Sequence, residues 1–76
     1  MNILTCKVTN YNENFTIASI VVPKGTKVED AVDMGRKLKK LADMVYPHLP
    51  TQPNVVRFYD EAGKYSWDMQ QIVRYV

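Results

Sequence analysis

The residue types that carry out most enzyme chemistry are scarce in this chain. It has one thiol, Cys6, and one imidazole, His48, whereas nucleophilic catalysis needs a nucleophile, a base and an orienting group held together. Cys6 alternates in phase with Leu4 and Val8, a spacing that predicts a buried and unreactive thiol. His48 falls in a proline-rich segment, which predicts a surface loop, and one histidine without nearby acidic residues does not make a metal site.

Most of the eight acidic residues have a structural explanation. The helix dipole favours negative charge at the start of a helix, and Asp and Glu are also common in turns. Three acidic residues begin a predicted helix and three lie in predicted turns: Glu29, Asp30 and Asp33, then Asp60, Glu61 and Asp68. The three glycines are isolated, so the chain has no phosphate-binding glycine loop. We therefore expect no catalytic residues, no metal site and no cofactor, and we expect that the protein is not an enzyme.

The length of the chain limits it to a single domain, residues 1–76, of 8.8 kDa. A domain this small buries only about 60% of the surface that its unfolded chain exposes, so a large active-site cavity would remove much of its core. Apolar residues make up 46% of the chain and charged residues 24%, which is typical of a globular rather than a disordered protein. We expect a solid module without a deep pocket.

The sequence also bears on where the protein acts. No apolar run approaches the ~18 residues of a membrane span, and Thr5 and Lys7 interrupt the first residues in a way that signal peptides do not show. A single cysteine excludes an internal disulfide. We expect a cytoplasmic protein that does not associate with membranes. Its net charge of +2 fits neither an acidic mimic of DNA nor a strongly basic, general DNA binder.

The N-terminal third predicts an antiparallel hairpin. Leu4, Cys6 and Val8 alternate with polar residues, which is the period of a half-buried strand. Three asparagines within residues 10–14 indicate a turn. The segment from Phe15 to Val22 is rich in β-branched residues on both faces, which predicts a second strand that is largely buried.

A helix over about residues 27–46 follows the hairpin. Thr26 and Glu29 have the spacing of a capping box, in which the two side chains satisfy two free backbone amides. Gly35 falls on the apolar face and predicts a close approach of the helix to the sheet. That face consists of residues at spacings of three and four: Val28, Ala31, Val32, Gly35, Leu38, Leu41, Ala42 and Val45.

The C-terminal third contains two strands and an ambiguous end. Pro47, Pro50 and Pro53 predict an extended connection, and strands are predicted at Val55–Tyr59 and Lys64–Trp67, joined by a type I turn with Gly63 in the left-handed conformation. Residues 69–76 fit a helix capped by Asp68, but the β character of Ile72–Val76 favours a turn and a fifth, edge strand. The predicted fold class is α+β, in the order ββαβββ, with one amphipathic helix packed on one face of an antiparallel sheet.

Four cations in five positions form a basic segment on the predicted helix. Helical geometry places Arg36, Lys37 and Lys40 on its exposed side. One interpretation is a solvated helix face, partly neutralised by Asp33 and Asp43. The other is a patch that binds a phosphate backbone or an acidic partner.

Aromatic residues gather on the predicted C-terminal strands. One helix can cover only one face of a sheet, so some of these rings either pack against other strands or meet a partner. Tyr, Trp and Arg are enriched at the hot spots of protein interfaces. The candidate partner-binding residues are therefore Arg57, Tyr59, Tyr65, Trp67, Arg74 and Tyr75.

In organisation, with one capped helix from Thr26 to Tyr46, a hairpin from Val55 to Trp67 and no catalytic set, the chain resembles the small accessory proteins of bacteriophages and mobile elements. This resemblance implies a host-takeover factor or anti-defence inhibitor, in the cytoplasm of the host, that blocks a surface of a larger protein. The predicted edge strand Ile72–Val76 would allow a homodimer. The alternative function is nucleic-acid binding through the helix patch and the sheet aromatics.

Overall fold

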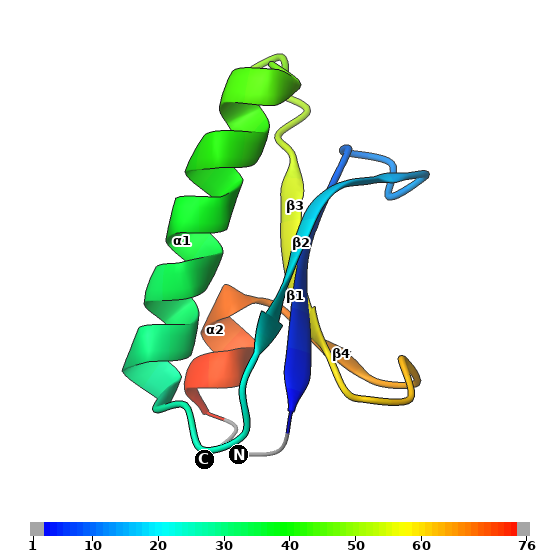
Figure 1. Ribbon diagram of the computed structural model, residues 1–76. Coiled ribbons are helices and arrows are strands. Elements are labelled where there is room, and N and C mark those ends of the chain that lie inside the picture. Colours follow the sequence, from blue (N-terminus) through cyan, green and yellow to red (C-terminus); the bar gives the residue numbers. More distant parts are fainter. Residues whose placement is uncertain (1–2, 75–76) are drawn as a thin grey trace.

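The computed structural model describes residues 3–74, and these residues form four strands and two helices (Figure 1). The strands make one antiparallel sheet in the order β2-β1-β3-β4, and both helices lie on the same face of it. The predicted α+β class is confirmed. In chain order the elements are β1 (Leu4–Thr9), β2 (Thr16–Val22), α1 (Val28–Val45), β3 (Val55–Tyr59), β4 (Ser66–Trp67) and α2 (Met69–Val73).

The predicted hairpin of β1 and β2 is present. Leu4 pairs with Val22 and Val8 with Ala18, while the side-chain oxygen of Asn10 accepts hydrogen bonds from the backbone of Asn14, at 2.7 Å, and of Phe15, at 3.2 Å. The prediction that the second strand is largely buried is wrong. In β2 only Val22 is fully buried, because β2 is an edge strand.

Helix α1 lies within the predicted range, but its start differs. The predicted capping box at Thr26 is wrong, because the Thr26 hydroxyl donates to the carbonyl of Pro23 at 2.7 Å and so stabilises the preceding turn. The N-cap residue is Lys27, whose side chain makes no capping hydrogen bond. The prediction that Leu41 and Val45 belong to the buried face of the helix is wrong, because they are 59% and 79% exposed.

The core lies between the helices and the inner face of the sheet. Gly35 of α1 provides the predicted close approach, because a Cβ at this position would lie 2.9 Å from the sulfur of Met69 and 3.1 Å from the ring of Phe58. A larger side chain would push α1 away from α2 and β3. The most deeply buried side chains of the core are Phe58, Leu4, Ile72, Val8, Val22 and Cys6.

The end of the described chain contradicts the predicted fifth strand. Residues Met69–Val73 form α2, with Asp68 as the N-cap residue. The Asp68 carboxylate accepts from the backbone of Gln70 and Gln71, and the Gln71 side chain accepts from the backbone of Asp68, which completes a capping box. The fold is therefore ββαββα over residues 3–74, and Tyr75 and Val76 of the predicted strand lie outside the described residues.

The turn between β3 and β4 is as predicted, but β4 is shorter. Gly63 adopts a left-handed conformation, with φ of 70°, and donates to the carbonyl of Asp60 at 3.0 Å. Tyr65 belongs to this turn, because its backbone exchanges hydrogen bonds with Asp60. Strand β4 consequently contains only Ser66 and Trp67.

Candidate functional site

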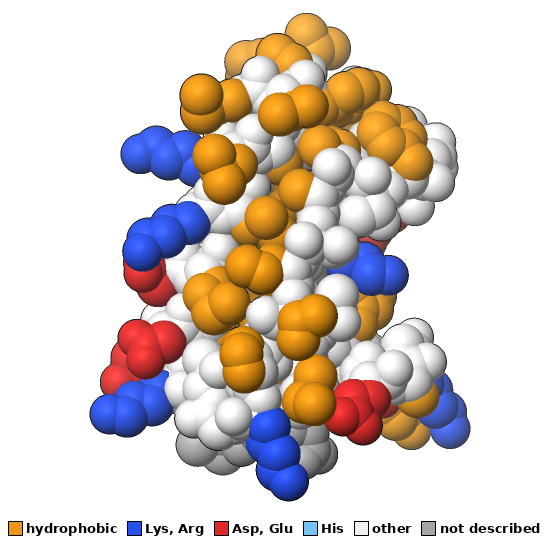
Figure 2. Space-filling model, viewed as in Figure 1, with side chains coloured by type: hydrophobic (Ala, Val, Ile, Leu, Met, Phe, Trp, Pro, Cys, Tyr) orange, Lys and Arg blue, Asp and Glu red, His pale blue; other side chains and the backbone are white. Residues whose placement is uncertain are grey.

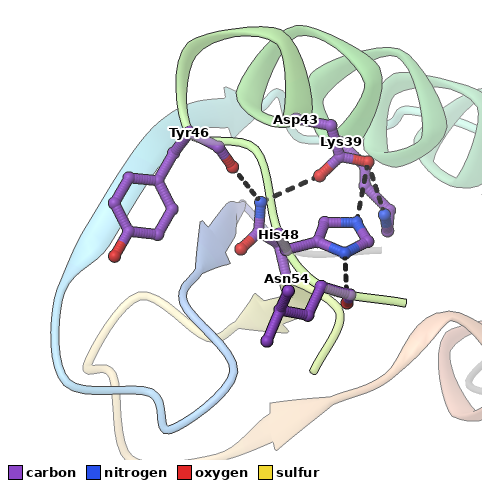
Figure 3. Close-up of polar contacts among 6 residues, drawn as sticks. Lys39, Asp43, Tyr46, His48 and Asn54 are labelled. Carbon is purple, nitrogen blue, oxygen red and sulfur yellow. Dashed lines mark hydrogen bonds and ion pairs between the residues drawn. The ribbon is translucent and has the colours of Figure 1, made fainter. Parts of the chain in front are cut away.

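A polar cluster joins the end of α1 to the proline-rich connection (Figure 3). The Asp43 carboxylate accepts hydrogen bonds from Lys39 at 2.7 Å and from the side-chain nitrogen of Asn54 at 2.9 Å, and His48 Nε2 lies 3.6 Å away. The same Asn54 nitrogen donates to the carbonyl of Tyr46 at 2.9 Å. The cluster therefore ties residues 46–54 to the last turns of the helix.

The hydrogen bonds and charges of this cluster determine the pKa of Asp43 and the orientation of the Asn54 amide. Burial alone would raise the pKa of Asp43, but the hydrogen bonds from Lys39 and Asn54, with the charges of Lys39 and His48, lower that pKa below its usual 3.8. Asn54 is only 4% exposed, and its side-chain oxygen has no hydrogen-bond partner among residues 3–74. Because Asp43 and the Tyr46 carbonyl both need a donor, the amide cannot turn over to satisfy this oxygen.

The structure shows the surroundings of the single thiol and the single imidazole of the chain. Burial raises the pKa of the Cys6 thiol from 9.0 to about 11, so the group stays protonated and poorly nucleophilic at neutral pH. No group of three or more His, Cys, Asp or Glu side chains in the described part of the chain is arranged to hold a metal ion. His48 lies in a loop, as predicted, but its contact with Asp43 gives it a structural role.

The cations of the predicted helix patch are exposed, but they do not act as one group. Lys37 pairs with Asp33 at 3.1 Å, four residues earlier on the helix. Arg36 instead lines an open groove of about 680 Å³ between α1, α2 and β3. Arg74 of the sheet set lines the same groove, so the structure brings together two arginines that the sequence placed in different sets.

Two of the candidate partner-binding residues share the open face of the sheet, the face opposite the helices. Arg57 and Tyr59 alternate with the buried Val56 and Phe58 of β3, so they point away from the core. The ammonium of Lys7 in β1 lies 5.0 Å from the centre of the Tyr59 ring. No element of residues 3–74 covers this face (Figure 1).

The other candidate residues lie elsewhere. Trp67 pairs with Phe58 across the sheet, so it lies on the helix side, where it is half-buried against the core. Tyr65 is exposed in the turn, with Lys64 5.4 Å from the centre of its ring. Arg74 follows α2, and Tyr75 lies outside the described residues. The predicted set is therefore spread over several surfaces.

Sequence reasoning missed a broad apolar surface, which we call the edge face. It runs along the gap between α1 and the edge strand β2, with charged side chains at its margins (Figure 2). The rings of Phe15 and Tyr46 meet edge to face at 5.1 Å and close one end of it. The strongly exposed members of the edge face are Phe15, Ile20, Leu41, Met44, Val45 and Tyr46, which are 40–79% exposed.

Two signals in the sequence point to this face. Met34, Leu38, Leu41 and Val45 form a second apolar stripe, turned to one side of the buried stripe of α1. The segment Thr16–Val22 contains no charged residue and no proline. Neither signal shows by itself which side of the helix the sheet leaves uncovered.

Comparisons of the chain with protein-family models, with curated proteins and with solved structures find no match. Neither helix among residues 3–74 is long and apolar enough to cross a membrane. The surfaces described above are therefore the basis for any statement about function.

Proposed function

We propose that the protein is a non-enzymatic module that binds a larger protein and blocks part of its surface. The observation that carries this proposal is the open face of the sheet, because both helices pack on the other side. The face presents Lys7, Arg57 and Tyr59 from paired central strands, so the three side chains stand on a rigid base. Tyrosine and arginine are among the residue types that are enriched at protein interfaces and at their hot spots.

The chemistry of this face favours a partner that displays carboxylates around an apolar centre. Lys7 is held against the Tyr59 ring, and Arg57 pairs with Glu13 at 3.0 Å. A partner carboxylate can replace Glu13 on the guanidinium, while the Tyr59 ring supplies apolar contact area with few rotatable bonds to order.

The alternative function, nucleic-acid binding through the helix patch and the sheet aromatics, requires these two sets to share one surface. Arg36, Lys37 and Lys40 extend from α1, on the helix side of the sheet, whereas Tyr59 points to the opposite side. One strand of nucleic acid would have to pass around the domain to contact both. We therefore treat nucleic-acid binding as an outcome of the test.

The test is an affinity pull-down from bacterial lysate with tagged protein, nuclease treatment and washing in ~0.5 M salt, which removes phosphate-driven binding. We expect one stoichiometric protein to be retained. The double variant Lys7→Ala/Tyr59→Ala should weaken that binding by about 30-fold or more, the effect of a hot-spot residue. The matched control is Lys64→Ala/Tyr65→Ala, which removes the other lysine–tyrosine contact, at the exposed turn.

Two outcomes would overturn the proposal. Unchanged binding by the Lys7→Ala/Tyr59→Ala variant would remove the open face from the site. Recovery of nucleic acid alone, lost in high salt and in an Arg36→Glu/Lys37→Glu/Lys40→Glu variant, would assign the function to the helix patch instead.

A further inference from the structure

The edge strand β2 offers hydrogen-bonding groups to a further strand. It pairs with β1 on one side, and no strand of residues 3–74 pairs with it on the other. Half of its backbone N–H and C=O groups therefore face outward. Natural edge strands are usually protected by lysine, proline or a covering loop. The seven residues of β2, Thr16–Val22, have no charge and no proline.

Helix α1 adds an apolar wall beside this strand. Leu41 and Val45 are 59% and 79% exposed, and the partly buried Met34 and Leu38 connect them to the core. The strand and the wall together form the continuous apolar band of Figure 2. A partner that covers the whole edge face therefore pairs a strand with β2 and packs apolar side chains against the wall of α1.

We propose that the edge face binds a second copy of this chain. Strand β2 pairs antiparallel with β2 of the copy, which gives one continuous sheet of eight strands across a two-fold axis. The two-fold axis of an antiparallel pair stands perpendicular to the sheet, so α1 of both copies lies on the same side. The apolar wall of each α1 then faces that of the other.

The spacing of the layers fits this arrangement. Helix α1 contacts β2 and β1 more extensively than β3, so its axis lies over the β1–β2 pair. Neighbouring strands are about 4.8 Å apart, so the axis of α1 is about 5 Å from the two-fold axis and about 10 Å from its symmetry mate. Packed helices are about 8–10 Å apart, so this separation allows the two walls to pack against each other.

The charges of the molecule favour a second copy over a charged partner. In a symmetric interface a residue near the two-fold axis lies beside its own copy, so a charge there would meet a like charge. Strand β2 and the wall residues Met34, Leu38, Leu41 and Val45 carry none. Arg36 lies on the opposite flank of α1, in the groove beside α2, and so stays outside the contact.

The test measures the mass of the purified, full-length protein in solution, by light scattering after gel filtration and by sedimentation, between about 5 and 500 µM. We expect twice the chain mass of 8.8 kDa at the upper concentrations. Ile20→Lys places a charge beside the β2 edge, and Leu41→Glu places one on the wall. Each should raise the dissociation constant by about 100-fold or more, because a buried, unpaired charge is strongly unfavourable at an interface.

The matched control is Val73→Lys, which adds the same charge at an apolar residue that is 56% exposed in α2, away from the edge face. It should leave the dimer intact. Circular dichroism shows whether each variant is folded, and Leu41→Glu keeps the test decisive if Ile20→Lys does not fold, since Leu41 is an exposed helix position.

A monomeric wild-type protein at 500 µM would overturn the proposal, as would a dimer that survives both variants. If the wild type is monomeric and its β2 amides become protected only with another captured protein, the edge face belongs to that protein. The test of the dimer is independent of the test of the open face. The Lys7→Ala/Tyr59→Ala variant should remain dimeric, and the Ile20→Lys variant should still bind the larger partner protein.

Discussion

Replacing Asn54 by aspartate should destabilise the fold in a way that depends on pH. The substitution keeps the shape of the side chain but replaces its NH₂ group with an oxygen, 2.9 Å from the Asp43 carboxylate and 2.9 Å from the Tyr46 carbonyl. Two carboxylates this close cannot both stay ionised, so the introduced group must bind a proton when the protein is folded.

The size of the effect follows from the cost of that proton. An aspartate ionises with a pKa of about 3.9 in the unfolded chain, so keeping it protonated at pH 7 costs about 4 kcal/mol. The lost hydrogen bond to Tyr46 adds about 1 kcal/mol. A chain of this length has a total stability of about 4–11 kcal/mol, so Asn54→Asp is close to unfolding at pH 7.

The sign of the pH dependence is fixed by the two pKa values. The carboxyl pair of the folded variant holds a proton with a pKa raised well above the value of about 3.9 in the unfolded state, so the unfolded chain releases a proton in the pH range between the two values. The stability of the variant relative to wild type is therefore highest at low pH and is lost as pH rises. The difference should grow by about 1.4 kcal/mol per unit between pH 5 and pH 7.

The assay is urea unfolding followed by Trp67 fluorescence at one low, fixed protein concentration. A domain of this size loses about 1 kcal/mol of stability per molar urea, so each pH unit should separate the midpoints by a further ~1.4 M. Asn54→Ala is the matched comparison, because it removes the two hydrogen bonds and the unpartnered oxygen without adding a charge. The stability that this variant loses should be the same at pH 5 and pH 7. Asn12→Asp, in the exposed turn, should change stability by less than about 0.5 kcal/mol. A gap between Asn54→Asp and wild type that does not widen with pH would refute the orientation of this amide.

Three further predictions concern the core and α2. Gly35→Ala should lose about 1 kcal/mol in the same urea assay, because the strain of packing against Met69 and Phe58 exceeds the gain of about 1 kcal/mol in helix propensity; a more stable variant would show that Met69 moves aside freely. Asp68→Ala should cost about 1 kcal/mol and speed amide hydrogen exchange in α2, and unchanged exchange would argue against the capping box. The Cys6 thiol, with its pKa raised to about 11, should react with a disulfide reagent at pH 8 only as fast as the protein opens. Rapid reaction without denaturant would contradict its burial.

The parts of the fold that could be predicted are those that depend on local signals. The alternation of Leu4, Cys6 and Val8 specifies a strand and also its buried face. The spacing of apolar residues specifies α1, and Gly63 specifies a left-handed turn position. In each case the residues within one element are sufficient to determine its structure.

The parts that could not be predicted depend on contacts between distant segments. Ile72 is β-branched and favours a strand by itself, but it is fully buried as part of a helix that Asp68 caps and that packs on α1. The exposure of β2 follows from its place at the edge of the sheet, which its own composition does not reveal. Leu41 and Val45 have the spacing of core residues, but the sheet covers only part of the apolar side of α1.

The sequence could place site residues that belong to one strand, but it could not show contacts between residues from different elements. Arg57 and Tyr59 could be placed on one face from alternation alone, whereas the contact of Lys7 with Tyr59 requires the pairing of β1 with β3. Asn54 and Asp43 are eleven residues apart and belong to no recognisable motif. Their hydrogen bond depends on how the proline-rich connection folds back on the helix.

The sheet has two very different edges, and this difference limits how many copies of the chain can associate through them. Strand β2 presents seven residues, but β4 at the other edge presents only Ser66 and Trp67 before the chain turns into α2. A strand of two residues is too short to hold a further chain in register. In the proposed dimer the two β2 edges are used, and each outer edge consists of β4 and the part of β3 that β4 does not pair, residues 55–57. The proposed association would therefore end at two chains, because neither outer edge has a free strand as long as β2, and this would protect a protein with an uncharged, exposed strand from polymerising into fibres.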